Sequence, residues 1–215
     1  MLIRVNTSTS VSRATRRAGR RREHVLRAAG EVLAERGAEG TRFADVSTAS
    51  GVPVSTLQYY FGNREDLIVA TFRHEVLAEQ TALSELVQDS DADPWQQLVS
   101  VIRLGVVDGE RSGTTWRIWV EFWRAALRDE ELRLEAHASY HNWRSLVAGV
   151  IRGGVASGRF QTDLDADEVA NLVVALIDGI GVPAALADPA LPRAHGTTAG
   201  LVEDAAARLL GITRP

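Results

Sequence analysis

Apolar residues recur along this chain with the spacing of helices, not with the alternation of strands. One face of the helix predicted over residues 20–36 carries Val25, Leu26, Ala29, Val32 and Leu33. Gly37 is suited to end that helix. Similar periods continue toward the C-terminus, interrupted by clusters of Gly, Pro, Asp and Ser. The pattern therefore predicts an all-α protein.

The interruptions divide the chain into roughly nine helices. Thr41 is a candidate N-cap for a second helix ending near Ser50, and a third covers about residues 54–60. Asn63 and Asp66 have the spacing of a capping box at the start of a fourth. Further breaks are predicted at Asp93–Pro94, 108–113, Arg128–Asp129, Gly158, Asp165 and 187–196, before a last helix over 197–210.

The second and third helices have the pattern of a helix-turn-helix. Gly51 can adopt the positive φ that a tight turn between them requires. Apolar residues of both helices point toward a shared core. The outer face of the third helix then carries Val54, Ser55, Gln58 and Tyr59. A helix of this kind fits the major groove of DNA, where its first residues meet base edges.

Charge is unevenly distributed along the chain, whose formal net charge is −4. Residues 1–65 contain 11 arginines and 6 acidic residues, whereas residues 66–215 contain 13 arginines and 22 acidic residues. A basic front end on an acidic body favours a local site for a polyanion. We expect residues 1–19 to form a disordered basic arm that follows DNA phosphates. An idle arm and an organelle transit peptide are the alternatives.

Composition excludes several classes of function. The chain has no cysteine, which rules out disulfides, cysteine-ligated zinc and thiol catalysis, and fits the cytoplasm. No apolar run approaches the ~18 residues of a membrane-spanning helix, so we expect no membrane contact. No nucleophile–base spacing, phosphate loop or full metal-ligand set is apparent. We therefore expect no catalytic residue, cofactor or bound metal.

The motif T-x-x-x-D-V over residues 41–46 is followed by S-x-x-S-G-V and then by STLQYYFGNREDL, which ends at Leu67. This succession resembles the DNA-binding domain of the TetR family of bacterial repressors. The segments WRIWVEFWRAALRDEELR and SGRFQTDLDADEVANLVVALIDGI are similar to the choline-responsive, betaine-pathway branch of that family. The resemblance implies a DNA-binding head over residues 20–67 and a ligand-binding and dimerisation domain over residues 68–215.

The resemblance also implies roles for individual residues of the head. Bases would be read by Ser55 and Gln58, and the DNA backbone would be contacted by Thr41, Arg42, Thr56, Tyr59, Tyr60 and Arg64. Three positions depart from the family pattern: Pro53 replaces a capping Ser, Val54 a common polar residue and Tyr60 a frequent His. Two alternatives remain for these residues. Tyr59 and Tyr60 are core aromatics in one, and Gln58 is an ordinary surface residue in the other.

Four of the five tryptophans lie between residues 116 and 143. An aromatic cluster with a carboxylate suits an organic cation, although an aromatic stripe is more often core. The candidate ligand pocket comprises Trp116, Trp119, Glu121, Trp123, His137, Tyr140 and Trp143. His137 and His141 have the i, i+4 spacing of two metal ligands, but no third ligand is evident.

Residues 169–186 are apolar nearly all round, which suits a helix buried on both faces. The resemblance implies a dimer interface in which this helix and the last one pair with their copies. The candidate interface residues are Leu172, Val173, Leu176, Gly179, Ile180 and Pro183. A helix buried entirely within one chain is the alternative.

Two classes of function remain open from the sequence. In the first, the protein is a homodimeric repressor that a small-molecule effector releases from a palindromic double-stranded DNA operator. In the second, it is a helical enzyme that uses the tryptophan-lined cavity. Sequence-specific DNA binding separates the two.

Overall fold

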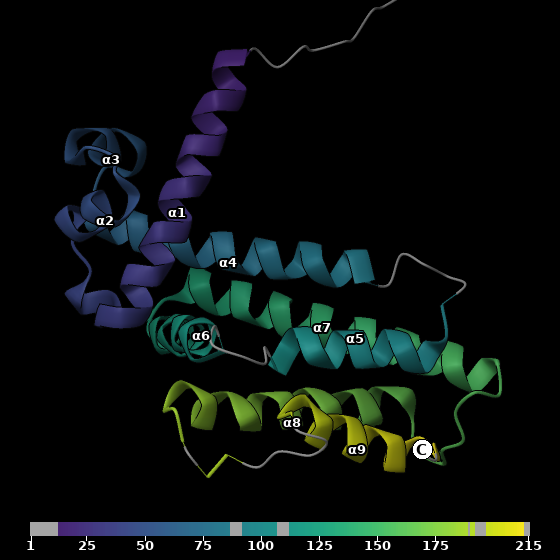
Figure 1. Cartoon of the computed structure of the whole chain (residues 1–215). Helices are drawn as coiled ribbons and strands as arrows, with labels where there is room; N and C mark the ends of the chain where they lie inside the picture. The colour runs from purple at the N-terminus through teal and green to yellow at the C-terminus, as the bar shows by residue number, and fades with distance from the viewer. Residues whose placement is uncertain (1–12, 87–91, 107–111, 189, 192–196, 213–215) are drawn as a thin grey trace, which may run out of the picture. The chain divides into compact units, whose positions relative to one another are not determined.

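The computed structural model describes residues 13–86, 92–106, 112–188, 190–191 and 197–212 (Figure 1). These ranges contain nine α-helices and no strand, which confirms the all-α prediction. The helices are α1 (Arg13–Gly40), α2 (Phe43–Ser50), α3 (Val54–Phe61), α4 (Arg64–Leu86), α5 (Pro94–Val106), α6 (Ser112–Ala126), α7 (Glu130–Ala156), α8 (Ala166–Ala185) and α9 (Ala199–Leu209).

The chain divides into two compact units, each with its own hydrophobic core. The first, here called the head, covers Met1–His74, and the second, the body, covers Glu75–Pro215. The division falls inside α4, whereas the sequence led us to place it after residue 67. Because α4 runs without interruption through this region, no turn or linker in the sequence marks the boundary.

The first helix begins earlier than predicted. It starts at Arg13 instead of residue 20, so residues 13–19 of the expected disordered arm are helical (Figure 1). Residues 1–12 lie outside the described ranges. The side chains of Arg17, Arg20 and Arg21 are exposed along this extension. Arginine has a high helix propensity, so a run of arginines is compatible with a helix as well as with a flexible arm.

Gly37 interrupts α1 with a φ of 69°, in line with the predicted break. The prediction that Thr41 caps α2 is wrong. Arg42 occupies the N-cap position, and no side-chain hydrogen bond caps that helix. The Thr41 hydroxyl turns back instead and donates to the Gly37 carbonyl at 2.8 Å, and Thr41 is only 1% exposed.

The core of the head holds the helix-turn-helix together. Gly51 ends α2 with a φ of 66°, as its place in the turn requires. Ser50 is buried beside it. Its hydroxyl donates to the Val46 carbonyl at 2.6 Å and accepts from the Val52 amide at 3.3 Å. The buried residues that form this core are Val25, Leu26, Ala29, Val32, Val46, Val52, Leu57, Phe61 and Leu67.

Two predicted helix starts are confirmed by their capping contacts. Asn63 Oδ1 accepts from the Asp66 amide at 2.8 Å, and Asn63 Nδ2 donates to the Asp66 carboxylate at 2.7 Å. At α7, Asp129 Oδ1 accepts from the Leu132 amide at 3.0 Å. These bonds satisfy amides that the first turn of a helix leaves without partners.

Helix α8 packs against α5, α6, α7 and α9 within the body. Its inner face contributes Val169, Val173 and Ile177 to the core. By length and composition alone this helix could span a membrane, which the sequence had not led us to expect. Burial within the body accounts for 44% of this apolar stretch, and the remainder includes an exposed apolar face.

Candidate functional site

The outer face of α3 carries the residues predicted to contact DNA. Ser55 and Gln58 are exposed, and Tyr59 is 86% exposed. This exposure is incompatible with the alternative that Tyr59 is a core residue. Thr56 and Tyr60 are half-buried, and Tyr60 packs against the core of the head. Buried Leu57 and Phe61 on the opposite face fix the rotation of α3 and keep Ser55 and Gln58 turned outward.

Two residues predicted to contact phosphate are engaged elsewhere. Thr41 is buried and its hydroxyl proton is donated to the Gly37 carbonyl, so the hydroxyl has no proton left to donate to a phosphate. The Arg64 guanidinium donates to the carbonyl oxygens of Ala38 and Glu39 and to the Glu65 carboxylate. Arg64 therefore holds the end of α1 against the start of α4. Arg42 also donates, from Nη1, to the carbonyl oxygens of Glu39 and Thr41, but its side chain is exposed and can reach a phosphate.

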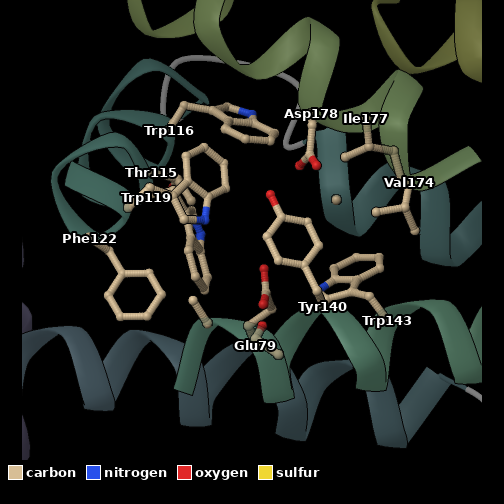
Figure 2. A pocket seen from close by; sticks show the side chains of 14 residues that line it. Glu79, Thr115, Trp116, Trp119, Phe122, Tyr140, Trp143, Val174, Ile177 and Asp178 are labelled. Carbon is tan, nitrogen blue, oxygen red and sulfur yellow. The ribbon is translucent and has the colours of Figure 1, made fainter. Parts of the chain in front are cut away.

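A second candidate site is a cavity inside the body (Figure 2). It is built mainly from aromatic side chains of α6 and α7, and α4, α5 and α8 complete it. Its volume is about 550 Å³ including the part that opens to solvent, so the enclosed part suits only a small molecule. The lining residues are Glu79, Gly105, Thr115, Trp116, Trp119, Phe122, Trp123, Ala136, Ser139, Tyr140, Trp143, Val174, Ile177 and Asp178.

Trp123 lies among the aromatic walls of this cavity. Its ring centroid is 6.0 Å from that of Trp116, 6.2 Å from Trp119 and 6.4 Å from Tyr140. The Trp123 and Tyr140 rings are stacked, with 19° between their planes. Figure 2 shows Trp116, Trp119 and Tyr140 around a common space. The negative faces of such rings attract a cation that is held between them.

Close packing against a glycine positions Trp116. A Cβ atom added to Gly181 of α8 would lie 2.1 Å from the Trp116 ring, so only glycine leaves room for the indole. The indole nitrogen of Trp116 donates to the Val106 carbonyl at 3.2 Å. Together these contacts hold one wall of the cavity in a single orientation.

The carboxylates of the cavity are Glu79 and Asp178, not Glu121 as the sequence suggested. Glu121 lies outside the lining and pairs with Arg124 at 3.0 Å. Burial raises the pKa of Glu79 to about 7, and Asp178 and Glu75 add to the rise. Burial also raises the pKa of Asp178, although a hydrogen bond from Tyr140 and the charge of Arg144 oppose the rise.

His137 does not line the cavity either, because it is exposed on α7, as is His141. Within the described ranges, no group of three His, Cys, Asp or Glu side chains could hold a metal ion. The cavity thus contains five of the seven residues proposed from the sequence: Trp116, Trp119, Trp123, Tyr140 and Trp143.

The outer face of α8 is apolar and exposed. Leu172 is 42% exposed, Leu176 40% and Val182 49%, and Gly179 is exposed between them. Val173 is fully buried in the core of the body, which corrects its assignment to a dimer interface, whereas Ile180 is half-buried and packs against that core. Pro183 is half-buried. The stripe that remains has the i, i+4, i+7 spacing of one helix face.

Comparison with known proteins places both units in one family. The family model described as "BetI-type transcriptional repressor, C-terminal" matches residues 76–211, and the model of the bacterial regulatory proteins of the tetR family matches residues 25–71. The chain belongs to the TetR family, in its BetI-type branch. Members of this family are DNA-binding transcriptional regulators, not enzymes, which decides between the two classes left open above.

Individual relatives of this regulator agree with that assignment. The regulator BetI of Burkholderia cenocepacia is 25% identical over 78% of this chain and 83% of its own length. BetI of Stenotrophomonas maltophilia is 28% identical, but over only 52% of this chain and 57% of the relative.

Solved structures share the fold. A regulator from Saccharomonospora viridis in complex with choline has a TM-score of 0.73 and 25% identity, over 90% of this chain and 96% of its own. FadR from Bacillus subtilis in complex with stearoyl-CoA has a TM-score of 0.65 and 19% identity, over 89% and 96% of the two chains.

Proposed function

We propose that this TetR-family regulator is a homodimeric repressor that a small organic cation of the quaternary ammonium class releases from a palindromic operator. One observation carries the proposal for the ligand. Glu79 and Asp178 face a cavity of four tryptophans and a tyrosine, and none of its described lining residues is basic. A quaternary ammonium ion gains from both kinds of group, because aromatic faces and carboxylates attract positive charge.

The chemistry of the cavity also argues against other effectors. The two carboxylates disfavour an anionic ligand such as the acyl-CoA bound by the Bacillus subtilis neighbour. The choline complex of the Saccharomonospora viridis neighbour supports a cation, since that protein shares both the fold and a quarter of its residues with this one. A neutral apolar ligand would offer no partner to the Oε2 atom of Glu79, which is buried without a hydrogen bond.

A calorimetric titration with choline and with 3,3-dimethylbutan-1-ol tests the ligand class. The second molecule has the same shape, but a neutral carbon replaces the charged nitrogen. We expect choline to bind at least about tenfold more tightly, because a desolvated cation–π contact contributes ~2 kcal/mol. Equal affinities for the two ligands, or no binding of choline, would refute an effector of this class.

For the DNA interface we propose that Ser55 and Gln58 read bases, whereas Arg42, Thr56, Tyr59 and Tyr60 contact the backbone. The exposure of Ser55, Gln58 and Arg42 supports these roles. The exposed arginines of the α1 extension, Arg17, Arg20 and Arg21, add phosphate contacts in this proposal. The regulator would reside in the cytoplasm and associate with the nucleoid when it is bound to its operator.

Substitutions of Gln58 and Arg42 separate base reading from phosphate binding. We expect Gln58→Ala to cost about 1–3 kcal/mol at the base that Gln58 reads and to relax preference there. Arg42→Ala should weaken binding to all DNA sequences alike. It should also lower the slope of log affinity against log salt concentration by about one. Anisotropy titrations on an operator and its single-base variants, at two salt concentrations, measure both effects. A uniform loss for Gln58→Ala would contradict base reading.

A further inference from the structure

The two carboxylates of the cavity come from different helices and have different surroundings. Glu79 projects from α4 and Asp178 from α8, and Figure 2 shows them on opposite sides of Tyr140. Asp178 accepts a hydrogen bond from the Tyr140 hydroxyl and feels the positive charge of Arg144. Arg144 also lies over the Tyr140 ring, 5.4 Å from its centroid. Asp178 therefore has partners that favour its charged form.

Glu79 has weaker support for a negative charge. It accepts hydrogen bonds from the Trp143 indole and the Ser139 hydroxyl, both neutral groups of α7. Among the residues that the structure describes, its Oε2 atom is buried without any hydrogen-bond partner. The charged groups that act on Glu79 are Glu75 on its own helix and Asp178 on α8, and both are negative.

The aromatic helix α6 supplies no compensating charge to this side of the cavity. Its contributions to the lining are Thr115, Trp116, Trp119, Phe122 and Trp123. A carboxylate that is buried beside other acids, without a cation, is stabilised by taking up a proton. In the empty cavity that proton has a place on the unpartnered Oε2 of Glu79.

We propose that Glu79 holds a proton while the cavity is empty and releases it to solvent when an organic cation binds, so that effector binding is coupled to proton release. The inference rests on the proposed function, since it needs a cationic effector. It adds a regulatory property, because the effector would act more strongly as the pH around the protein rises. No bond other than the O–H bond of Glu79 is broken.

The direction of the pH dependence follows from the free state. The pKa of Glu79 is raised to about 7 in the empty cavity, so below that pH the carboxyl is mostly protonated. A bound cation lowers this pKa by its opposite charge. Between the pKa of Glu79 in the cation-bound protein and its pKa in the free protein, the affinity for the cation should fall about tenfold for each pH unit of acidification. Above about pH 7 this affinity should be constant.

Calorimetry with choline chloride on the full-length protein tests this coupling. Titrations at about pH 6 in two buffers of different ionisation enthalpy give the number of protons released per cation bound. We expect close to one proton at about pH 6 and close to none at about pH 8.5. Glu79→Gln should release none at either pH. Glu85→Gln, which changes an exposed acid of the same helix, should behave as the unaltered protein does.

The possible results separate the inference from the proposal beneath it. Choline binding without proton release at about pH 6 would overturn the inference and leave the proposed effector class intact. Proton release that persists in Glu79→Gln would assign the proton to another group and would also overturn it. A lack of choline binding at both pH values would remove the effector class, and the coupling with it. The measurement on the unaltered protein decides the coupling even if Glu79→Gln does not fold.

Discussion

Leu176→Glu is expected to lower the affinity of the protein for a palindromic operator by about 100-fold or more. Leu176 lies in the exposed stripe of α8 that also contains Leu172 and Val182. We propose that this stripe forms the dimer interface, so in a twofold-symmetric dimer the substitution buries one unpaired charge from each protomer there. A monomer has only one head and cannot bind two half-sites at once. Linking two binding sites raises the overall affinity by about 10²–10⁴-fold, and the monomer loses this gain.

Light scattering and DNA anisotropy measure the two parts of this effect. The variant should be a monomer at concentrations where the unaltered protein is a dimer. Leu134→Glu is the matched control, since Leu134 is a leucine of α7 that is 61% exposed and lies outside the proposed interface. Leu134→Glu should change neither the molar mass of the protein in solution nor its affinity for the operator. A Leu176→Glu variant that stays dimeric would place the interface elsewhere.

Gly181→Ala is expected to destabilise the body by about 1–3 kcal/mol and to abolish tight choline binding. The new methyl group would lie 2.1 Å from the Trp116 ring, well inside contact distance, so the indole or the helix must move. Overpacking of a tight core has costs of this size. The same displacement disturbs an aromatic wall of the cavity, so the loss of ligand affinity should exceed the effect expected from stability alone.

Chemical denaturation and choline titration of the same samples test this expectation. Gly149→Ala serves as the control, because a Cβ atom there meets nothing within 4 Å, on an exposed face of α7. It should raise stability by up to about 1 kcal/mol through helix propensity and leave choline binding unchanged. If Gly181→Ala were as stable and bound choline as well as Gly149→Ala, the contact between α8 and Trp116 would not shape the cavity.

Local sequence signals predicted the head well. Gly51 determines the conformation of its own turn, and Asn63 bonds to Asp66 three residues further on. Because both effects are local, the sequence pattern predicts them directly. The role of Arg64 has no such local signal, whereas the Thr41 bond to Gly37 is local but competes with the capping role expected for a threonine at this position. Each side chain bonds to the end of α1, and for Arg64 that partner lies 26 residues away along the chain.

In the body, helical phase explains most of the errors. Trp119 and Trp123 face the cavity, and a helix turns ~100° per residue, so Glu121 between them must point elsewhere. His137 is likewise one position out of phase with Ala136 and Tyr140, which line the cavity. The helical period alone therefore excludes Glu121 and His137 from the face that lines the cavity.

Glu79 and Asp178 could not have been found from the tryptophan segment. They lie on α4 and α8, far from it in sequence, and only tertiary packing brings them to the same cavity. Their one sequence signal is an acidic residue within an otherwise apolar helical face, which Asp178 shows in the run from Val173 to Ile180. Such a residue indicates a functional cavity only once its neighbours on other helices are known.

Release from DNA by an organic cation can be measured on the protein–DNA complex itself. A duplex selected from random sequence for tight binding is labelled, bound by the protein and titrated with choline or with 3,3-dimethylbutan-1-ol. We predict that choline lowers the affinity for the duplex by about 5–150-fold, the range of a coupling free energy of ~1–3 kcal/mol, and that the neutral analogue does not. Unchanged DNA affinity at saturating choline, or equal release by both molecules, would show that a cation does not control DNA binding by this regulator.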